Sequence, residues 1–357
     1  MKTYIKFLIN LFNISFFKIF IIFFTIIFVT NILEQIEFFK DKDLSFFNII
    51  FLSFLNTPSI LFDIFPFIFL LSTQIFFIQL INNNELEIFK YRGLDNIKII
   101  KILGIYSFIL GILLVIFFYN TASVLKNSYL LIKNSYAENN KYLAVITRNG
   151  LWIKDEINES INIINANKVA DNFLLNVSIT KFNKNFDIIE IIESKKIDIT
   201  SKKWKIFNPT VRKNNSQSVL NEILLDSNFD LEKINSLFSN LSSLNIVDLI
   251  TLRKSYMSLN YSVTDIDSHL LKIATYPIYL ALITIFSAVI MFSIGYQKNT
   301  FFKITLGILL SVIIYYISNF LSVLGTNEKI PITLSIFLPL IILSIINFTS
   351  IIKLNEK

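Results

Sequence analysis

The sequence of 357 residues contains no cysteine and a single histidine. Without cysteine the chain has no disulfide framework and no thiolate metal site, and one histidine, His269, excludes a histidine-rich metal cluster. The G-x4-G-K-[ST] pattern is also missing, so the chain does not bind ATP through a P-loop. No nucleophile–base pair and no metal-ligand spacing is visible, so we expect no enzyme, no metal and no cofactor.

A basic surface of the kind that binds nucleic acid is missing as well. The net charge is +7, but no polar segment combines a basic patch with interleaved aromatic residues. Much of the positive surplus lies beside apolar segments, where it relates to membrane orientation. We therefore expect no nucleic-acid partner.

Apolar side chains are present in excess. Hydrophobic residues make up 54% of the chain and its mean hydropathy is +0.60, whereas soluble domains are nearer about 45–50% apolar. Six blocks carry the excess, and each reaches the roughly 20 residues that a helix needs to cross a bilayer. The blocks cover residues 14–36, 54–81, 97–120, 269–294, 301–324 and 330–352. The sequence therefore predicts six transmembrane helices, three before and three after a long polar segment.

Lysine and arginine in the short flanks predict the orientation of these helices. One side receives eleven such residues, whereas the other receives only Lys40, Lys42 and Lys329. The eleven are Lys2, Lys6, Lys18, Lys90, Arg92, Lys98, Lys101, Lys298, Lys303, Lys353 and Lys357. We expect both termini on the cytoplasmic side, which places residues 123–265 outside.

Residues 123–265 have the pattern of β-strands. Residues 175–180 alternate between apolar and polar, and further short candidates lie at 188–192, 197–199 and 204–207. The pattern predicts an antiparallel sheet of roughly ten strands with one apolar face. A helix over 243–258 follows, with Asn245 or Ser243 as its N-cap.

The bend between the second and third blocks, residues 83–93, has the pattern of a short helix with a cap at each end. Asn84 is a good N-cap, Glu85 and Glu87 fall in the first turn, and basic residues fall in the last turn. Gly93 suits the left-handed position after a helix. The segment is either a well-capped connector or a coupling helix that docks into a cytoplasmic partner.

The same bend carries a family resemblance. Pro66 lies one span before Glu85-Leu86, and Glu85 precedes Gly93 by eight residues. This spacing resembles the P-(span)-E-L-x6-G signature of the LptF/LptG permeases, the membrane subunits of the lipopolysaccharide-export ABC transporter. Four further motifs resemble that family in the same order: Gly150-Leu151-Trp152 with Asp155, Lys272-Ile273-Ala274 with Pro277, Tyr316 to Gly325, and Ile330-Pro331 with Leu338-Pro339.

The resemblance implies a fold, partners and a location. Residues 1–122 would form transmembrane helices one to three with the coupling helix, residues 123–265 a periplasmic β-jelly-roll-like domain with a connecting helix, and residues 266–357 helices four to six. The chain would be a permease of the bacterial inner membrane, without its own ATPase site. It would extract lipopolysaccharide and pass it to a periplasmic jelly-roll bridge. The partners would be an LptB-like ATPase dimer, an LptF-like second permease, and LptC-like and LptA-like jelly-roll proteins. The G-L-W motif and Glu34-Gln35 favour the LptG branch over the LptF branch.

Two sets of residues follow from the resemblance. The coupling set comprises Glu85, Leu86, Glu87, Phe89 and Gly93. The lipid-binding set comprises Lys40, Lys42, Lys126, Lys133, Lys272, Phe24, Phe28, Tyr316 and Phe320. Four of the lysines lie near the positions of family cations and read equally as solvated loop charges: Lys40, Lys42, Lys126 and Lys133. Lys272 is either a cation of the cavity or a snorkelling residue. An ionisable group inside the second span, Asp63, is a candidate by default, but it lies only about two turns from the outer edge, which favours a water-accessible position.

Two other classes of protein compete with this interpretation. Permeases of the lipoprotein-release or macrolide-export type have four spans and place the external domain after the first. A non-transporting scaffold that anchors a periplasmic domain would not need a capped coupling helix.

Overall fold

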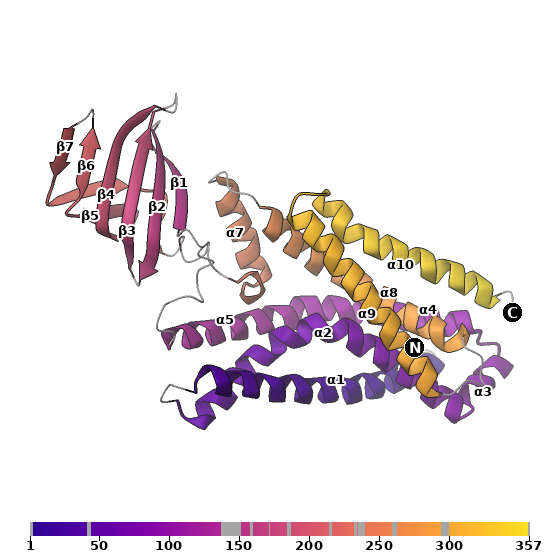
Figure 1. The fold of residues 1–357 in the computed structure, drawn as a ribbon. Helices are drawn as coiled ribbons and strands as arrows, with labels where there is room; N and C mark the ends of the chain where they lie inside the picture. The colour runs from indigo at the N-terminus through magenta and orange to yellow at the C-terminus, as the bar shows by residue number, and fades with distance from the viewer. Residues whose placement is uncertain are drawn as a thin grey trace. The chain divides into compact units, whose positions relative to one another are not determined.

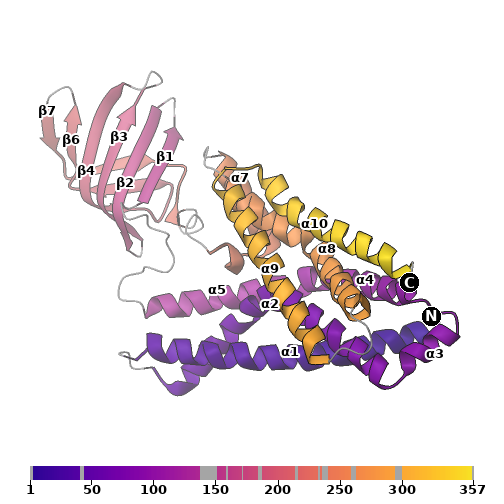
Figure 2. The ribbon, with the colours of Figure 1, turned by 45° about the vertical axis from the view of Figure 1, so that its right-hand side comes forward.

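The computed structural model describes residues 3–40, 44–136, 151–157, 160–170, 172–183, 187–213, 216–231, 234, 240–258, 263–293 and 300–355. Figure 1 shows its helices and strands, and Figure 2 shows them from a second side. The chain forms two compact units. Met1–Lys126 and Val263–Lys357 make up the first, which holds the long apolar helices, and Asn127–Ser262 makes up the second, which holds the β-sheet.

Six helices in the described residues are long and apolar enough to cross a membrane, which confirms the predicted count. Three precede the β-sheet in sequence and three follow it. The first three spans are α1 (Thr3–Phe38), α2 (Phe46–Asn82) and a continuous helix made of α4 (Asn96–Leu113), the π-helix η1 (Leu114–Tyr119) and α5 (Asn120–Ser135). The last three are α8 (Thr264–Ser293), α9 (Thr300–Thr326) and α10 (Ile332–Asn355).

Several helices extend well beyond the apolar blocks that predict them. The first begins at Thr3 rather than near residue 14, and the third continues to Ser135 rather than ending near residue 120. Hydropathy marks the part of a helix that suits hydrocarbon. Backbone hydrogen bonds, however, continue through polar residues until a cap or a turn ends them.

The helix α8 lies at the centre of the membrane unit. It packs against α2, α4, α9 and α10, whereas α1 packs mainly on α2. The helices α4 and α8 approach each other closely at Gly111, where a Cβ atom would lie 2.7 Å from the Cα atom of Pro277. Only glycine fits there, because no side-chain atom can come that close to a backbone atom.

Polar side chains join the central helices through backbone carbonyls. Pro66 in α2 has no N–H, so the carbonyl of Phe62 lacks its donor within the helix. The hydroxyl of Tyr276 in α8 donates to that carbonyl. Further along α2, the Ser287 hydroxyl of α8 donates to the Leu70 carbonyl at 2.9 Å. These bonds matter in hydrocarbon, where no water can replace a missing partner.

A smaller polar cluster joins α1 to α2. The Asn56 amide donates to Oδ1 of Asn31 at 2.8 Å, and the Asn31 amide donates to the Thr57 hydroxyl at 3.3 Å. All three side chains are buried. The cluster fixes the register of α1 on α2 in this part of the membrane unit.

The second unit contains one antiparallel sheet of eight strands within the described residues. The strands β1 (Leu151–Ile157), β2 (Ser160–Ala170), β3 (Phe173–Phe182) and β4 (Ile188–Asp198) pair in sequence order. The sheet then forks, because one end of β4 pairs with β5 (Lys203–Phe207) and the other with β6 (Thr210–Lys213). Each branch gains one more strand, β8 (Glu222–Asp226) beside β5 and β7 (Ser216–Val219) beside β6.

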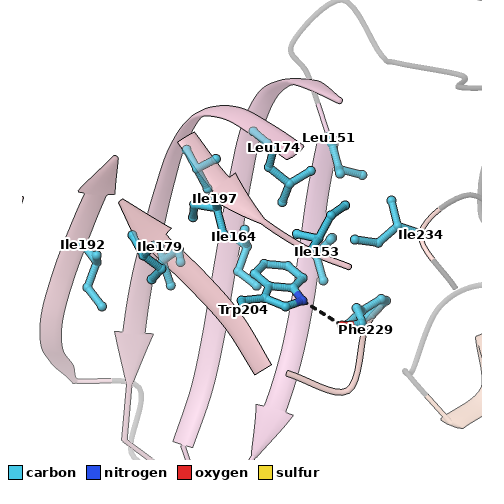
Figure 3. Close-up of a cluster of buried hydrophobic side chains, with 14 of the residues drawn as sticks. Leu151, Ile153, Ile164, Leu174, Ile179, Ile192, Ile197, Trp204, Phe229 and Ile234 are labelled. Carbon is cyan, nitrogen blue, oxygen red and sulfur yellow. Dashed lines mark hydrogen bonds between the residues drawn. The ribbon is translucent and has the colours of Figure 1, made fainter. Parts of the chain in front are cut away.

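The core of this unit lies on one face of the sheet (Figure 3). Trp204 of β5 is fully buried among the isoleucines of β1 and β2, and its indole N–H donates to the Phe229 carbonyl at 2.7 Å. The buried Asp155 of β1 accepts from the Ser227 hydroxyl at 2.8 Å and from the Asn228 amide at 2.8 Å. The segment after β8 is therefore fixed against the first strand.

The described residues contain eight strands, against the roughly ten predicted for the whole segment, and β4 shows one reason for the difference. The candidates at 188–192 and 197–199 are one strand, because the polar residues between them continue the ladder with β3 instead of forming a turn. At the far end of this strand, Thr200 donates its backbone N–H and its hydroxyl to Asp198, which lowers the pKa of that carboxyl. The helix expected over 243–258 is α7 (Ile246–Ser258). Asn245 caps it by accepting from the Asp248 N–H at 2.9 Å, and Ser243 does not.

Candidate functional site

The bend between the second and third spans contains the predicted short helix, α3 (Glu85–Tyr91). Gly93 has φ +77° and ends it as expected, with the Gly93 N–H donating to the Lys90 carbonyl at 2.9 Å. The prediction for Asn84 was right about its position and wrong about its role. It adopts φ +56° and its side chain makes no capping bond, because the left-handed backbone turns that side chain away from the first N–H groups.

The faces of α3 separate the five predicted coupling residues. Leu86 is buried, and the ring of Phe89 contacts that of Phe7 in α1 at 5.9 Å between centroids, so these two side chains hold α3 to the membrane unit. Glu85 is half-buried, and its Oε2 has no hydrogen-bond partner among the described residues. Glu87 is exposed.

Two exposed residues of α3 were missed by the sequence interpretation. The side chain of Tyr91 is 90% exposed and that of Ile88 is 52% exposed. Both lie on the same side of the helix as Glu87, since residues three and four apart are neighbours on a helix. The sequence could not have identified this face, because a segment of seven residues gives no sign of which side another helix covers.

The predicted aromatic residues of α1 belong to a ladder of stacked phenylalanines. Neighbouring rings four residues apart lie 5.9–6.5 Å from each other along Phe12, Phe16, Phe20, Phe24 and Phe28. The N-terminal part of the ladder packs on α2. There the ring centroid of Phe65 lies 6.2 Å from that of Phe16 and 6.1 Å from that of Phe20. Phe24 and Phe28 remain half-buried.

The predicted aromatic residues of α9 lie on its uncovered side. Tyr316 is 68% exposed and Phe320 is 65% exposed. We compared the buried share of the most apolar 18-residue window in each helix. This share is 11% in α9 and 17% in α1, but 61% in both α2 and α8. The helices α1 and α9 therefore present apolar surface to whatever surrounds the chain.

The five predicted lysines have different environments. Lys40 is exposed, and Lys42 lies outside the described residues. Lys133 is buried in the second unit, where it donates to the Tyr129 hydroxyl at 2.7 Å and lies over that ring at 5.3 Å. Lys126 and Lys272 come from α5 and α8, and the charge of one carboxylate in the membrane unit acts on both.

That carboxylate belongs to Asp63 of α2. Beside it, the Tyr119 hydroxyl and Nε2 of His269 are hydrogen-bonded at 3.0 Å. The Phe62 ring lies 5.1 Å from the Tyr119 ring and 4.5 Å from the Tyr276 ring. Asp63, Lys126 and Lys272 lie where α2, the η1–α5 segment and α8 meet.

Six spans with a β-domain inserted between the third and the fourth define a polytopic membrane protein. This arrangement differs from the four-span permeases that carry their external domain after the first span. The sequence matches the family described as lipopolysaccharide export system permease LptF/LptG over residues 6–353, and the chain belongs to that family. No curated protein matches the chain.

Proposed function

We propose that this chain is one of the two permease subunits of an ABC transporter that extracts lipopolysaccharide from the bacterial inner membrane. In this proposal residues 1–122 and 266–357 form the membrane part, with both termini in the cytoplasm, and residues 123–265 form the periplasmic domain. The G-L-W motif favours the LptG-like role within the pair. Energy comes from a separate LptB-like ATPase dimer.

The feature that carries the coupling proposal is the two-sided character of α3. Leu86 and Phe89 anchor the helix to the membrane unit, while Glu87, Ile88 and Tyr91 project from it. A rigidly held helix with an apolar and acidic outer face suits insertion into a groove of a partner, since aromatic anchors dominate such contacts. We assign the contact to Glu87, Ile88 and Tyr91, with Glu85 at its rim and Gly93 closing the helix.

The lipid would be held by α1 and α9. Phe24, Phe28, Tyr316 and Phe320 offer apolar surface for acyl chains. Lys40, Lys42, Lys126 and Lys272 supply cations for phosphate groups. Lys133 is buried against Tyr129, so we assign it to the packing of α5 instead of to the lipid. The second, LptF-like permease would close the cavity along the uncovered sides of α1 and α9.

The β-domain would pass the lipid on to LptC-like and LptA-like jelly-roll proteins. In the described part of the sheet, β1, β7 and β8 each pair along one edge only. An open strand edge can accept a strand of another sheet, which would continue the apolar face from one protein to the next.

Co-purification with the ATPase tests the coupling proposal. Ile88→Ser and Tyr91→Ala remove exposed side chains and should leave the fold unchanged, yet they should reduce recovery of the ATPase at least tenfold. Glu87→Lys reverses the charge of the same face and should act in the same direction. Phe47→Ala, at the other end of α2 and 75% exposed, is the matched control and should bind the ATPase normally. Normal recovery with all three α3 variants would contradict the coupling role.

A further inference from the structure

The π-helix η1 interrupts the third span between two regular helices, α4 and α5. A π-helix forms i→i+5 hydrogen bonds, so each of its turns holds one residue more than a turn of α-helix. The span is continuous from Asn96 to Lys133, and η1 therefore adds a residue to it without breaking it. Such segments are rare, occur mostly as single turns, and are frequent at functional sites.

The two ends of η1 are held in different ways. On the α4 side, Gly111 packs so closely on α8 that a Cβ atom would lie 2.7 Å from the Cα atom of Pro277, which leaves α4 no room to turn there. At the other end the contact with α8 is between side chains, because the Tyr119 hydroxyl and Nε2 of His269 are hydrogen-bonded at 3.0 Å. A contact between side chains can be exchanged for that of a neighbouring residue, whereas the backbone contact at Gly111 fixes the register.

Polar side chains directly after η1 serve its carbonyl groups. Nδ2 of Asn120 donates to the Ile116 carbonyl at 2.7 Å. The Thr121 hydroxyl donates to the carbonyls of Phe117 and Phe118 at 3.1 and 2.9 Å. A carbonyl in a membrane helix that changes its backbone partner would otherwise pass through an unpaired state, which is costly in hydrocarbon. Donors already in place at three consecutive carbonyls allow the backbone bonds of η1 to rearrange.

Along the chain, η1 lies between the bend and the β-sheet. The helix α3 ends at Tyr91 and α4 begins at Asn96, so a movement of α3 acts directly on the third span. At the other end of the span, α5 ends at Ser135, and the next described strand, β1, begins at Leu151. The third span therefore joins the helix proposed to contact the ATPase to the inserted domain.

We propose that η1 is a register switch in the third span: its extra residue is held in the resting chain and is released into α5 when the ATPase moves α3. The η1 turn then tightens to i→i+4 bonds while α4 stays fixed at Pro277. Phe118 takes the place of Tyr119 opposite His269, and α5 turns by roughly 100° and advances by about 1.5 Å, the values for one residue of α-helix. This inference rests on the proposed function, because it takes the separate ATPase as the source of the movement.

Cysteine pairs test the switch, since the natural chain has no cysteine that would interfere. The full-length protein is assembled in nanodiscs with the ATPase and the second permease, and a short bifunctional thiol reagent joins each pair. Tyr119→Cys with His269→Cys should crosslink about tenfold more than Phe118→Cys with His269→Cys in the absence of nucleotide. A non-hydrolysable ATP analogue should reverse this preference, because a bound ligand shifts a two-state equilibrium toward the state that it favours. Asn31→Cys with Asn56→Cys, between α1 and α2, is the control and should crosslink equally in both conditions.

Deletion of Ile116 tests the extra residue itself. With one residue fewer, an α-helical turn leaves Tyr119 opposite His269, so the protein should fold and bind the ATPase normally. The chain then has no residue to release, and we expect release of lipopolysaccharide to fall about tenfold. Deletion of Ile105, an exposed residue of α4 where the helix holds no extra residue, should instead displace Gly111 from Pro277 and prevent recovery of folded protein. A deletion of Ile116 that fails to fold, or that transports normally, would overturn the inference.

The outcomes separate this inference from the proposed function. If the wild-type chain does not co-purify with the ATPase, the proposed function is wrong, and the source of the movement with it. If the ATPase binds but the nucleotide leaves the preference for residue 119 over residue 118 unchanged, only the register switch is wrong. A nucleotide effect of the same size on the control pair would show a movement of the membrane unit that is not specific to η1, and would also overturn the inference.

Discussion

The helices α2 and α8 differ from α1 and α9 in a way that hydropathy does not reveal. The four spans have mean hydropathies between 2.0 and 2.4, yet 61% of the apolar window is buried in α2 and α8, against 17% in α1 and 11% in α9. We call α2 and α8 the buried pair, and α1 and α9 the exposed pair. The buried pair shares hydrogen bonds from Tyr276 and Ser287 to α2 carbonyls.

The difference indicates a division of labour. Helices that exchange side-chain hydrogen bonds in hydrocarbon are hard to separate, because each broken bond leaves a polar group without a partner. Helices that present phenylalanine, isoleucine and tyrosine can change apolar neighbours at little cost. We therefore expect the buried pair to act as a frame, and the exposed pair to contact lipid or the second permease.

The largest expected effect comes from removing a ring of the buried pair. Phe65 of α2 is fully buried and contacts the rings of Phe16, Phe20, Phe62, Phe69 and Phe118. Phe65→Ala should lower the free energy of unfolding by about 3 kcal/mol, from lost burial and an unfilled cavity. Phe320→Ala on α9 should change it by about 0.5 kcal/mol or less. Unfolding in mixed micelles measures both, and equal losses would remove the distinction between the pairs.

A somewhat smaller effect is expected where α4 packs closely on α8 of the buried pair. Gly111→Leu puts side-chain atoms where Pro277 already lies, and overpacking of this kind costs about 1–3 kcal/mol. The same measurement on Val323→Leu, an exposed position of α9, should give a change of about 0.5 kcal/mol or less. An unchanged unfolding curve for Gly111→Leu would mean that α4 and α8 are not packed this closely.

A single hydroxyl tests the role of the interhelical bonds. Tyr276→Phe leaves the Phe62 carbonyl without a donor, and we expect a loss of about 1–2 kcal/mol in the free energy of unfolding. Tyr316→Phe removes the same atom from the exposed pair and should have no measurable effect. If the two substitutions are equally harmless, Tyr276 is not the donor that replaces the missing N–H of Pro66.

The smallest of these effects concerns the contact between the two pairs. Asn56→Leu removes the donor to Asn31 and should cost about 0.6 kcal/mol, the average for such bonds in membranes. Its clearer result should be faster hydrogen exchange in α1 around Asn31, with α8 unaffected. Unchanged exchange in α1 would show that the contact is not needed to hold α1 on α2.

The sequence predicts the six spans and the inserted sheet because apolar runs and alternating strands are local patterns. It also predicts Gly93 as the end of α3 and limits the cap of α7 to Asn245 or Ser243, since both features are set by a few neighbouring residues. The covered side of α3 could not be predicted, because it depends on Phe7 from another helix.

Local sequence patterns could not predict that Asp63, Lys126 and Lys272 lie close together, for the same reason. Lys126 and Lys272 were each expected near lipid, but Asp63, whose charge acts on both, lies 63 and 209 residues away along the chain. Only the packing of α2, η1–α5 and α8 brings the three together. The Tyr276 bond was missed although Pro66 was noted, since a proline shows that a carbonyl is freed but not which donor reaches it.

The most direct measurement is photo-crosslinking of lipopolysaccharide to single positions in the reconstituted transporter. A photoreactive residue at Phe24 or Tyr316 of the exposed pair should crosslink to the lipid, and ATP should abolish the crosslink when the ATPase is present. The same residue at Leu61 or Leu280 of the buried pair should give no crosslink under either condition. Crosslinks of equal strength in both pairs, or crosslinks at Phe24 and Tyr316 that ATP leaves unchanged, would contradict the proposed permease.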